Sequence, residues 1–328
     1  MKLATMPGPT DDGRLVIVSR NLRQMIAADD IAPTMLEAIR RWDDVSPALA
    51  ERFDLLQSGE GDDREGVTAF DAGAAMAPLP RAPQWLDGSV FQTHLDLMAR
   101  ALHPEKPAQP SDFPYVYQGA SDDLRGATDP ITGYRPDEGI DFEGEFGIVV
   151  DDVPMRVSVD DALRLVRLLV LVNDVSLRAY AGREITVGFG FLNAKPSTAF
   201  APVAVTPDEL AGAWHDGRVH LPLTVQRSGE WFGHPHGSEM TFHFGELIAH
   251  AARTRRLSAG TIIGSGTVSN DDRSVGSACI AERRAIEMTD DGAASTPFLG
   301  DGETVHIEVR DASGASVFGA IHQEVHAS

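Results

Sequence analysis

Residues 141–150 read Asp-Phe-Glu-Gly-Glu-Phe-Gly-Ile-Val-Val, and residues 169–178 read Leu-Val-Leu-Val-Asn-Asp-Val-Ser-Leu-Arg. In both stretches acidic residues stand next to an apolar run. The runs Glu145–Val150 and Leu169–Val175 predict two buried strands, because few polar residues interrupt them. The residues between them, from Val159 to about Leu168, are predicted to form a helix. At the ends of these two strands, acidic side chains therefore adjoin the apolar core.

Glu143 and Glu145 lie two residues apart, so on a strand their carboxylates point to the same face. Two carboxylates in one place repel each other unless a cation or a proton lies between them. Hard oxygen ligands suit Mg²⁺, Mn²⁺ or Ca²⁺, although most pairs at this spacing lie on solvated faces. Asp174, at the inner end of the second strand, has two interpretations of similar weight. It is either a metal ligand or the N-cap of the next segment.

Toward the N-terminus, residues 14–19 are predicted to form a strand and residues 33–56 to be helical. A polar, acidic stretch at 58–65 has no periodic pattern and is predicted to be a surface loop. A proline-rich joint follows it. We therefore place a boundary near residue 75, between a small N-terminal domain (1–75) and a larger domain (76–328).

In the larger domain, strands cluster late in the sequence, which argues against a regular doubly wound sheet. The expected fold class is α+β, with a mixed-β core and flanking helices. Besides the two central strands, strands are predicted at 203–205, 219–226, 261–264, 279–288, 305–309 and 317–319, and an amphipathic helix at 241–255.

Composition excludes several classes of protein. The 328 residues include 28 Lys+Arg and 49 Asp+Glu, a formal net charge of −21. Such a charge repels phosphate backbones and anionic lipids, so neither nucleic acid nor a membrane is an expected partner. The longest apolar run, Leu168–Val172, is far shorter than the ~20 residues that span a bilayer, and residues 1–5 lack the apolar core of a signal peptide. We expect a soluble, cytoplasmic protein.

Three further side chains are candidates for chemistry. Lys195 is one of only three lysines, and a compact amine with a tunable pKa does what arginine cannot. His94 stands where a helix begins, although a lone histidine is more often structural. The single cysteine, Cys279, rules out an intrachain disulfide and is interpreted as a small buried residue, not a nucleophile.

These pieces, taken in order, resemble the fumarylacetoacetate hydrolase family over roughly residues 76–328, with the N-terminal region matching that family's N-terminal domain. No single motif is specific, but their order and gaps are. The motifs are Asp87 with His94, Tyr117-Gln118-Gly119, Asp141-Phe142-Glu143-Gly144-Glu145, Asn173-Asp174-Val175-Ser176-Leu177-Arg178, Asn193-Ala194-Lys195-Pro196-Ser197-Thr198, Gly264-Ser265-Gly266-Thr267-Val268-Ser269, and Glu282.

The resemblance implies a mixed β-roll or β-sandwich core, a homodimer and a role for each candidate residue. It implies a divalent cation, Mg²⁺ in preference to Ca²⁺ or Mn²⁺, and a general base that takes a proton from water. The implied metal ligands are Asp87, Glu143, Glu145 and Asp174. The implied base is His94, oriented by Glu282. The resemblance further implies that Arg178 and Lys195 hold and polarise the substrate carbonyls, and that Tyr117 and Thr267 contact the substrate.

Two departures from the family pattern bear on the reaction. Leu97 stands where many smaller members carry a lid glutamate, which favours the fumarylacetoacetase-like arrangement with a partner Glu from a late strand. In the alternative interpretation, Glu282 is a plain strand residue paired with Arg283 or Arg284. Ala181 stands where a substrate-binding glutamine is expected, which leaves the substrate open.

The implied function is that of a metal-dependent hydrolase acting on carbon–carbon bonds in ketonic substances. The substrate class is a 1,3-diketo acid, with fumarylacetoacetate cleaved to fumarate and acetoacetate in aromatic amino acid catabolism. The alternatives are an acylpyruvate hydrolase, a keto-acid hydratase or a decarboxylase on the same scaffold. A rival from another class is a catalytically silent protein that binds metal and keto acid.

Overall fold

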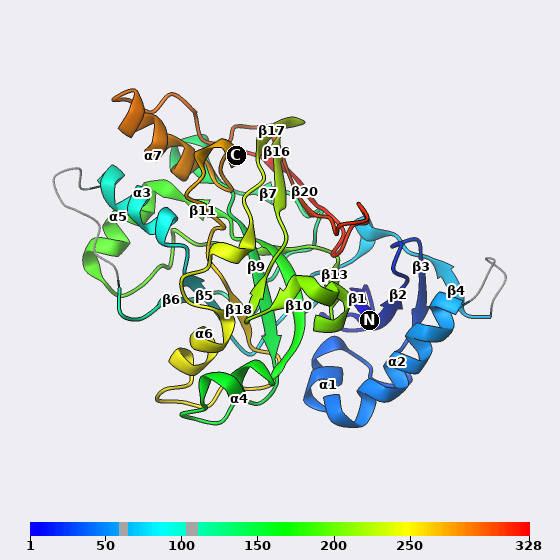
Figure 1. Ribbon diagram of the computed structural model, residues 1–328. Coiled ribbons are helices and arrows are strands. Elements are labelled where there is room, and N and C mark those ends of the chain that lie inside the picture. The colour runs from blue at the N-terminus through cyan, green and yellow to red at the C-terminus, as the bar shows by residue number, and fades with distance from the viewer. Residues whose placement is uncertain (59–64, 103–110) are drawn as a thin grey trace.

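The centre of the molecule is a large mixed sheet. The computed structural model describes residues 1–58, 65–102 and 111–328 (Figure 1). The sheet has eleven strands in the order β4-β3-β2-β1-β13-β10-β9-β18-β5-β6, with β12 also paired to β10. Among the strand pairs of this sheet in the described residues, β18 with β5 is parallel and the others are antiparallel. The strands are β1 (Lys2–Met6), β2 (Arg14–Val18), β3 (Gln24–Ala27), β4 (Val67–Ala69), β5 (Trp85–Ser89), β6 (Tyr115–Gly119), β9 (Gly144–Val150), β10 (Val166–Asn173), β12 (Ala199–Phe200), β13 (Val203–Val205) and β18 (Ile262–Gly264).

A second sheet packs against one face of the first. Its five strands follow the order β17-β16-β19-β20-β7, and two short antiparallel pairs, β8 with β11 and β14 with β15, lie outside both sheets. Their bounds are β7 (Ile131–Thr132), β8 (Ile140–Asp141), β11 (Ser176–Leu177), β14 (Trp214–His215), β15 (Arg218–Val219), β16 (Leu223–Arg227), β17 (Glu230–Gly233), β19 (Thr304–Val309) and β20 (Ile321–His326).

The helices lie around these sheets. Figure 1 shows α3, α5 and α7 grouped on one side of the molecule and α1 with α2 on the other. None of the helices in the described residues combines the length and the apolar character needed to cross a bilayer. The α-helices are α1 (Met35–Arg40), α2 (Trp42–Ser58), α3 (Gln92–Leu102), α4 (Val159–Leu163), α5 (Arg178–Val187), α6 (Phe244–Ala251) and α7 (Ile280–Asp290); short 3₁₀ helices are η1 (Ala72–Ala74), η2 (Pro136–Glu138), η3 (Pro207–Ala213), η4 (Gly237–Glu239) and η5 (Arg273–Val275).

Strand β10 explains why the central sheet is apolar on both faces. Leu169 and Leu171 belong to the core between the two sheets, whereas Leu168 and Val170 belong to the core under α1 and α2. Successive strand residues point to opposite faces, so a strand between two cores needs apolar residues at every position. The predicted mixed-β core with flanking helices is therefore confirmed.

The N-terminal strands extend the same sheet. Strand β1 pairs with β2 on one side and with β13 on the other, so the sheet runs without a break from the first residues into the larger part of the chain. The division near residue 75 stays a prediction. Residues 59–64 of the predicted surface loop lie outside the described residues.

Several predicted elements are wrong in kind or extent. Residues 279–288, predicted as a strand, form helix α7. Ala, Glu, Arg and Met are strong helix formers, and over ten residues the apolar positions fit both periods. The helix predicted from 159 to 168 ends at Leu163, and β10 begins at Val166. Residues 317–319 form no strand, because the chain turns at Gly319 (φ +77°) before β20.

Candidate active site

Three carboxylates converge at the ends of neighbouring strands. Asp87 comes from β5, Glu145 from β9, and Asp174 follows β10, and one oxygen from each lies within 4.8 Å of the others. Strand β18 separates β5 from β9, and its last residue is Gly264. A Cβ at this position would lie 2.2 Å from Asp87 Oδ1 and 3.1 Å from Glu145 Oε2. The missing side chain therefore creates the space in which the carboxylates meet.

These three carboxylates are buried, and the positive charge beside them is too small to compensate their negative charge. Glu145 is fully buried, and neither of its carboxylate oxygens has a hydrogen-bond partner among the described residues. Asp87 Oδ1 accepts a hydrogen bond from the Gly266 backbone N–H at 3.1 Å. Burial first, and then neighbouring carboxylates, raise the pKa of Asp87 and of Glu145 well above its usual value. Such a site holds protons or a cation, and its oxygen-only donors fit a divalent metal ion.

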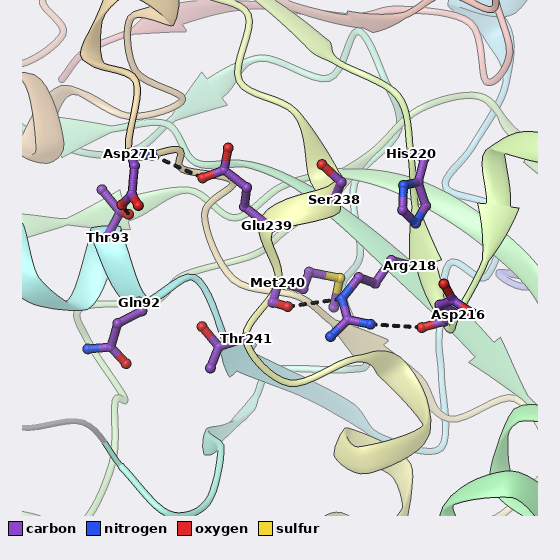
Figure 2. Close-up of a pocket in the computed structure, with 10 residues that line it drawn as sticks. All are labelled: Gln92, Thr93, Asp216, Arg218, His220, Ser238, Glu239, Met240, Thr241 and Asp271. Atoms are coloured by element: carbon purple, nitrogen blue, oxygen red, sulfur yellow. Dashed lines mark hydrogen bonds between the residues drawn. The ribbon is translucent and has the colours of Figure 1, made fainter.

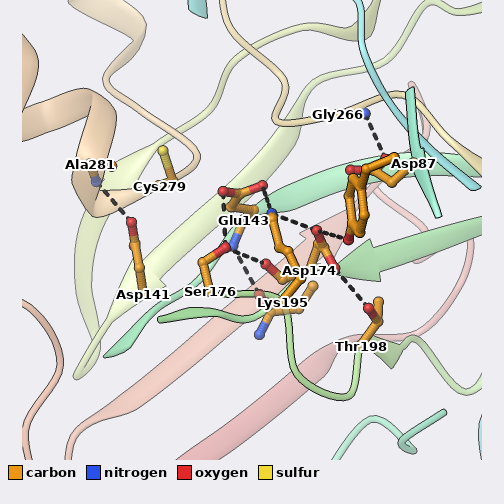
Figure 3. Close-up of polar contacts among 12 residues, drawn as sticks. Asp87, Asp141, Glu143, Asp174, Ser176, Lys195, Thr198, Gly266, Cys279 and Ala281 are labelled. Carbon is orange, nitrogen blue, oxygen red and sulfur yellow. Dashed lines mark hydrogen bonds and ion pairs between the residues drawn. The ribbon is translucent and has the colours of Figure 1, made fainter. Parts of the chain in front are cut away.

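Beside it, two carboxylates are paired with cations. Lys195 Nζ lies between Glu143 and Asp174, at 2.8 Å from Glu143 Oε2 and 2.6 Å from Asp174 Oδ2 (Figure 3). Arg178 donates to Glu143 Oε1. Burial opposes ionisation of Glu143, but Lys195 and Arg178 hold its pKa well below the usual range. Burial likewise disfavours the Lys195 charge, and Asp174 with Glu143 outweigh it, so the pKa of Lys195 is raised.

The contacts of Asp174 contradict its interpretation as an N-cap, and its role as a metal ligand stays a prediction. Its carboxylate accepts hydrogen bonds from the Tyr117 hydroxyl at 2.7 Å and from Thr198 Oγ1 at 2.7 Å, in addition to the Lys195 ion pair. None of these bonds caps a helix. Next to it, Asn173 Oδ1 accepts the backbone N–H of Glu143 at 3.0 Å and its Nδ2 donates to Gln323 of the second sheet at 2.8 Å. The side chains at this strand end are thus fixed from both sheets.

His94 and Glu282 form a buried pair between α3 and α7. His94 Nδ1 lies 2.9 Å from Glu282 Oε2. A carboxylate at Nδ1 favours the tautomer whose lone pair is on Nε2, so Nε2 is the nitrogen that can accept a proton. Arg283 and Arg284 donate to the carbonyls of Phe232 and Thr296, so they are not the partners of Glu282. The partner glutamate comes from a helix, not from the predicted late strand.

Asp141 connects Arg178 to the start of α7, a contact that its place in the motif at 141–145 does not reveal. Its Oδ1 accepts the Ile280 N–H at 2.8 Å, and its Oδ2 accepts Arg178 Nε at 2.8 Å. Its Oδ2 also accepts the Ala281 N–H at 2.9 Å (Figure 3). A carboxylate at a helix N-terminus satisfies free N–H groups and complements the helix dipole. Asp141 therefore fixes the start of α7, which carries Glu282, against Arg178.

Cys279 is the N-cap of α7 and is fully buried. Its Sγ accepts the Glu282 N–H at 3.3 Å, and burial, followed by the charge of Asp141, raises the pKa of the thiol well above its usual value. A protonated, buried thiol is a poor nucleophile. This agrees with the interpretation of Cys279 as a small buried residue.

These groups open onto one cavity of about 610 Å³. Glu145, Asp174 and Glu282 do not line the cavity, but each lies close to a residue that does: Asp87, Lys195 and His94, respectively. Thr267 is 3% exposed, and its hydroxyl has no hydrogen-bond partner among the described residues, so it is available to a bound molecule. The predicted site residues that line the cavity are Asp87, His94, Tyr117, Glu143, Arg178, Lys195 and Thr267.

A second cavity, of about 490 Å³, contains none of the predicted site residues (Figure 2). It lies on the other side of the start of α3, where Thr93 lines it while His94 faces the first cavity. Arg218 there donates to the backbone carbonyls of Met240 and Asp216, both at 3.0 Å. The predicted chemistry is thus confined to the first cavity.

Comparison with known proteins gives two matching family models, which together cover nearly the whole chain. Residues 84–326 match the model described as fumarylacetoacetate (FAA) hydrolase C-terminal, and residues 1–81 match fumarylacetoacetase N-terminal domain 2. A 2,4-didehydro-3-deoxy-L-rhamnonate hydrolase of Sphingomonas sp. (strain SKA58) is 30% identical over 159 residues, 47% of this chain and 52% of that protein, so the match spans about half of its length. An oxaloacetate tautomerase of Bacillus subtilis (strain 168) is 21% identical over 262 residues, 79% of this chain and 83% of that protein.

Solved structures share the fold at low sequence identity. A fumarylacetoacetate hydrolase from Exiguobacterium antarcticum has a TM-score of 0.66 at 18% identity, with both chains covered in full. A maleylpyruvate hydrolase from Sphingobium sp. SYK-6, in complex with manganese(II) and pyruvate, has a TM-score of 0.66 at 16% identity, again over both complete chains.

Proposed function

The chain belongs to the fumarylacetoacetate hydrolase family of enzymes, and on that premise we propose that it is a metal-dependent hydrolase that cleaves a carbon–carbon bond of a 1,3-diketo acid. Fumarylacetoacetate is the proposed substrate, and fumarate and acetoacetate are the products. The observation that carries the proposal is the shared cavity. The His94–Glu282 pair, the carboxylate group and two cations all adjoin it.

The metal-binding part rests on Asp87, Glu145 and Asp174, whose oxygens are close together and buried, and on Glu145, whose two oxygens have no hydrogen-bond partner among the described residues. A divalent cation bound there supplies Lewis-acid stabilisation of negative charge on the substrate oxygens. Mg²⁺ is the proposed ion, with Ca²⁺ and Mn²⁺ as alternatives. Glu143 joins this set only if it releases Lys195 or Arg178, to which it is bound here.

The remaining steps use the side chains of this protein. His94 Nε2 takes one proton from water while the water oxygen bonds to a ketone carbon, and Glu282 stabilises the imidazolium that forms. Lys195 and Arg178 stabilise the oxyanion on that carbon. The bond to the central carbon then breaks, and its electron pair forms an enolate. The imidazolium returns its proton to the enolate carbon, which leaves a carboxylic acid and a methyl ketone.

The test is consumption of fumarylacetoacetate by the purified protein, with acetylpyruvate as the comparison substrate, before and after exhaustive chelation. Cleavage that depends on added metal, and that favours the first substrate, is the expected result. The variant His94→Ala should lose turnover by about 10²–10⁴-fold while it still binds metal. Full activity after chelation would remove the metal from the proposal, and unchanged turnover in His94→Ala would remove water activation by His94.

Keto–enol tautomerisation of a keto acid is the second candidate function. The relative matched over most of both chains is an oxaloacetate tautomerase, and the same cavity can hold an enolate and a base. Product mass separates the two reactions, because hydrolysis adds one water and yields two acids, whereas tautomerisation leaves the mass unchanged. A homodimer, a cytoplasmic location and a place in aromatic amino acid catabolism stay predictions of the resemblance.

A further inference from the structure

One arginine in the cavity wall, Arg284, forms no ion pair with any residue that the structure describes. Helix α7 lines the cavity with Ala281, Arg284, Ala285 and Met288, the spacing of a single helix face. Arg284 is half-buried, donates to the Thr296 carbonyl, and stacks its guanidinium 4.6 Å from the centre of the Phe298 ring. No ion pair among the described residues involves Arg284. These two contacts orient the guanidinium and leave its charge unpaired.

The other two cations of the cavity differ from it. Lys195 is paired with Glu143 and Asp174, and Arg178 with Asp141 and Glu143. In these pairs, carboxylates compensate the positive charges of Lys195 and Arg178 at the inner end of the cavity. Arg284 stands farther along α7, by about one helical turn from Ala281.

The surroundings of Arg284 favour the binding of an anion. The cavity wall is mostly apolar and includes Leu95, Met98, Ile185, Phe191, Met288 and Phe298. A guanidinium makes planar, paired hydrogen bonds to a carboxylate. On the facing helix, Ala181 and Gly182 are small and leave room for the ligand.

We propose that Arg284 binds a second carboxylate, at the end of the substrate away from the carbons that react. The substrate class is then a diketo acid with a carboxylate at each end, held between the carboxylate-bound cation site and Arg284. This inference rests on the proposed function, because it assigns the two ends of the substrate of that same site. Arg284 is thereby a specificity-determining residue rather than part of the bond-breaking machinery.

The chain offers a matched control in the neighbouring residue. Arg283 also donates to a backbone carbonyl, that of Phe232, and also stacks on an aromatic ring, with its guanidinium 5.0 Å from the Phe232 ring centre. Arg283 does not line the cavity. The variants Arg284→Gln and Arg283→Gln therefore remove the same charge and the same kind of contacts, one inside and one outside the cavity.

The experiment measures kcat/KM of the metal-loaded enzyme for fumarylacetoacetate, which has two carboxylates, and for acetylpyruvate, which has one. Arg284→Gln should lower the value for fumarylacetoacetate by about 10- to 100-fold and leave that for acetylpyruvate within about threefold. Arg283→Gln should leave both values within about threefold of the wild type. A fall of equal size for both substrates in Arg284→Gln, or equal falls in the two variants, would overturn the proposal.

A binding measurement keeps this test separate from the proposed reaction. Titration calorimetry compares fumarate with crotonate, in which a methyl group replaces one carboxylate. The wild type and Arg283→Gln should bind fumarate at least about tenfold more tightly than crotonate, and Arg284→Gln should lose that difference. Absence of turnover with this preference intact would reject the hydrolase and keep the Arg284 site. Equal binding of the two acids by the wild type would reject the Arg284 site whatever the reaction.

Discussion

Two neighbouring pairs of buried carboxylates in this protein have opposite electrostatic situations. Glu143 and Asp174 share Lys195, and Glu143 also binds Arg178. Asp87 and Glu145 lie just beyond them, equally buried, and no cation pairs with either among the described residues. The pKa of Glu143 is held low by its cations, whereas burial and like charges raise the pKa of Glu145.

This difference separates structure from ligand binding. A buried carboxylate with its own cation is complete in the folded chain, and removing one partner leaves an uncompensated charge. A buried carboxylate without a cation destabilises the fold unless it gains a proton or a metal ion. The paired carboxylates therefore position Lys195 and Arg178, with Asp174 also adjoining the cation site, and the unpaired ones are available to a ligand.

The largest expected effect tests the unpaired side. Replacing Glu145 by Gln removes one negative ligand, so divalent-cation affinity should fall at least about 100-fold and turnover about 10³-fold. Equilibrium dialysis with Mn²⁺ and steady-state kinetics measure these two quantities. Wild-type affinity in Glu145→Gln would show that the cation is bound elsewhere.

Replacing Glu143, a paired carboxylate, and replacing Glu145, an unpaired one, should change the free energy of unfolding in opposite directions. Glu143→Gln leaves Lys195 and Arg178 with less counter-charge, which should lower the free energy of unfolding of the metal-free chain by about 3–5 kcal/mol. Glu145→Gln should raise it, because an unpaired buried carboxylate is removed. Urea unfolding in the presence of chelator measures both. If both variants were destabilised alike, the distinction between the two pairs would fail.

The third prediction concerns the space between the carboxylates. A Cβ at residue 264 would also lie 2.5 Å from the buried Trp85 ring, so the variant Gly264→Ala must push Asp87 or the strand aside. Metal affinity should fall about 10- to 100-fold, measured by the same dialysis. The control is Gly182→Ala, which lines the cavity but whose Cβ would meet nothing within 4 Å. Equal effects of the two variants would contradict the proposed role of Gly264.

The sequence predicts one half of this comparison better than the other. The carboxylates, Lys195 and the order of the motifs are visible in it, because ligand-type residues at strand ends are a local pattern. The roles of Gly264 and Asp141 are not, because a glycine between two carboxylates and a carboxylate at a helix N-terminus depend on contacts between distant segments. Asp141 and Ile280 are 139 residues apart.

The fold shows the same division. The buried strands around Glu145 and Leu169 follow from continuous apolar runs, which need no tertiary information. Helix α7 is missed because ten residues with Ala, Ile and Met at mixed spacing fit a strand as well as a helix. Its first turn is set by Cys279 and Asp141, and neither is a signal that a single sequence marks as a cap.

A smaller effect is expected where the paired side meets the His94–Glu282 pair. Asp141→Asn keeps the shape but removes the charge that holds Arg178 and the start of α7, so Glu282 should lose its orientation toward His94. We expect kcat to fall about tenfold, by a larger factor than KM rises, and the pH profile of kcat to shift, because the base is affected more than the substrate contact of Arg178. A change in KM alone would indicate that Asp141 acts only through substrate binding by Arg178.

The smallest effect is the pH dependence of stability in the metal-free protein. The carboxyl groups of Asp87 and Glu145 release their protons near pH 4 in the unfolded chain, whereas burial and like charges raise their pKa values in the folded chain. From about pH 4 upward the folded state therefore binds more protons than the unfolded state, and this contribution to stability declines as pH rises. Between pH 5 and 8, the Tm of the wild type should fall by a few degrees relative to that of Glu145→Gln. Added Mn²⁺ or Mg²⁺ should raise the wild-type Tm more at pH 8 than at pH 5, since the ion replaces protons that are bound at the lower pH. Thermal scans of the two proteins, with chelator and with metal, measure these changes in Tm. If the wild-type Tm ran parallel to that of Glu145→Gln at every pH, the raised pKa values would not belong to this site.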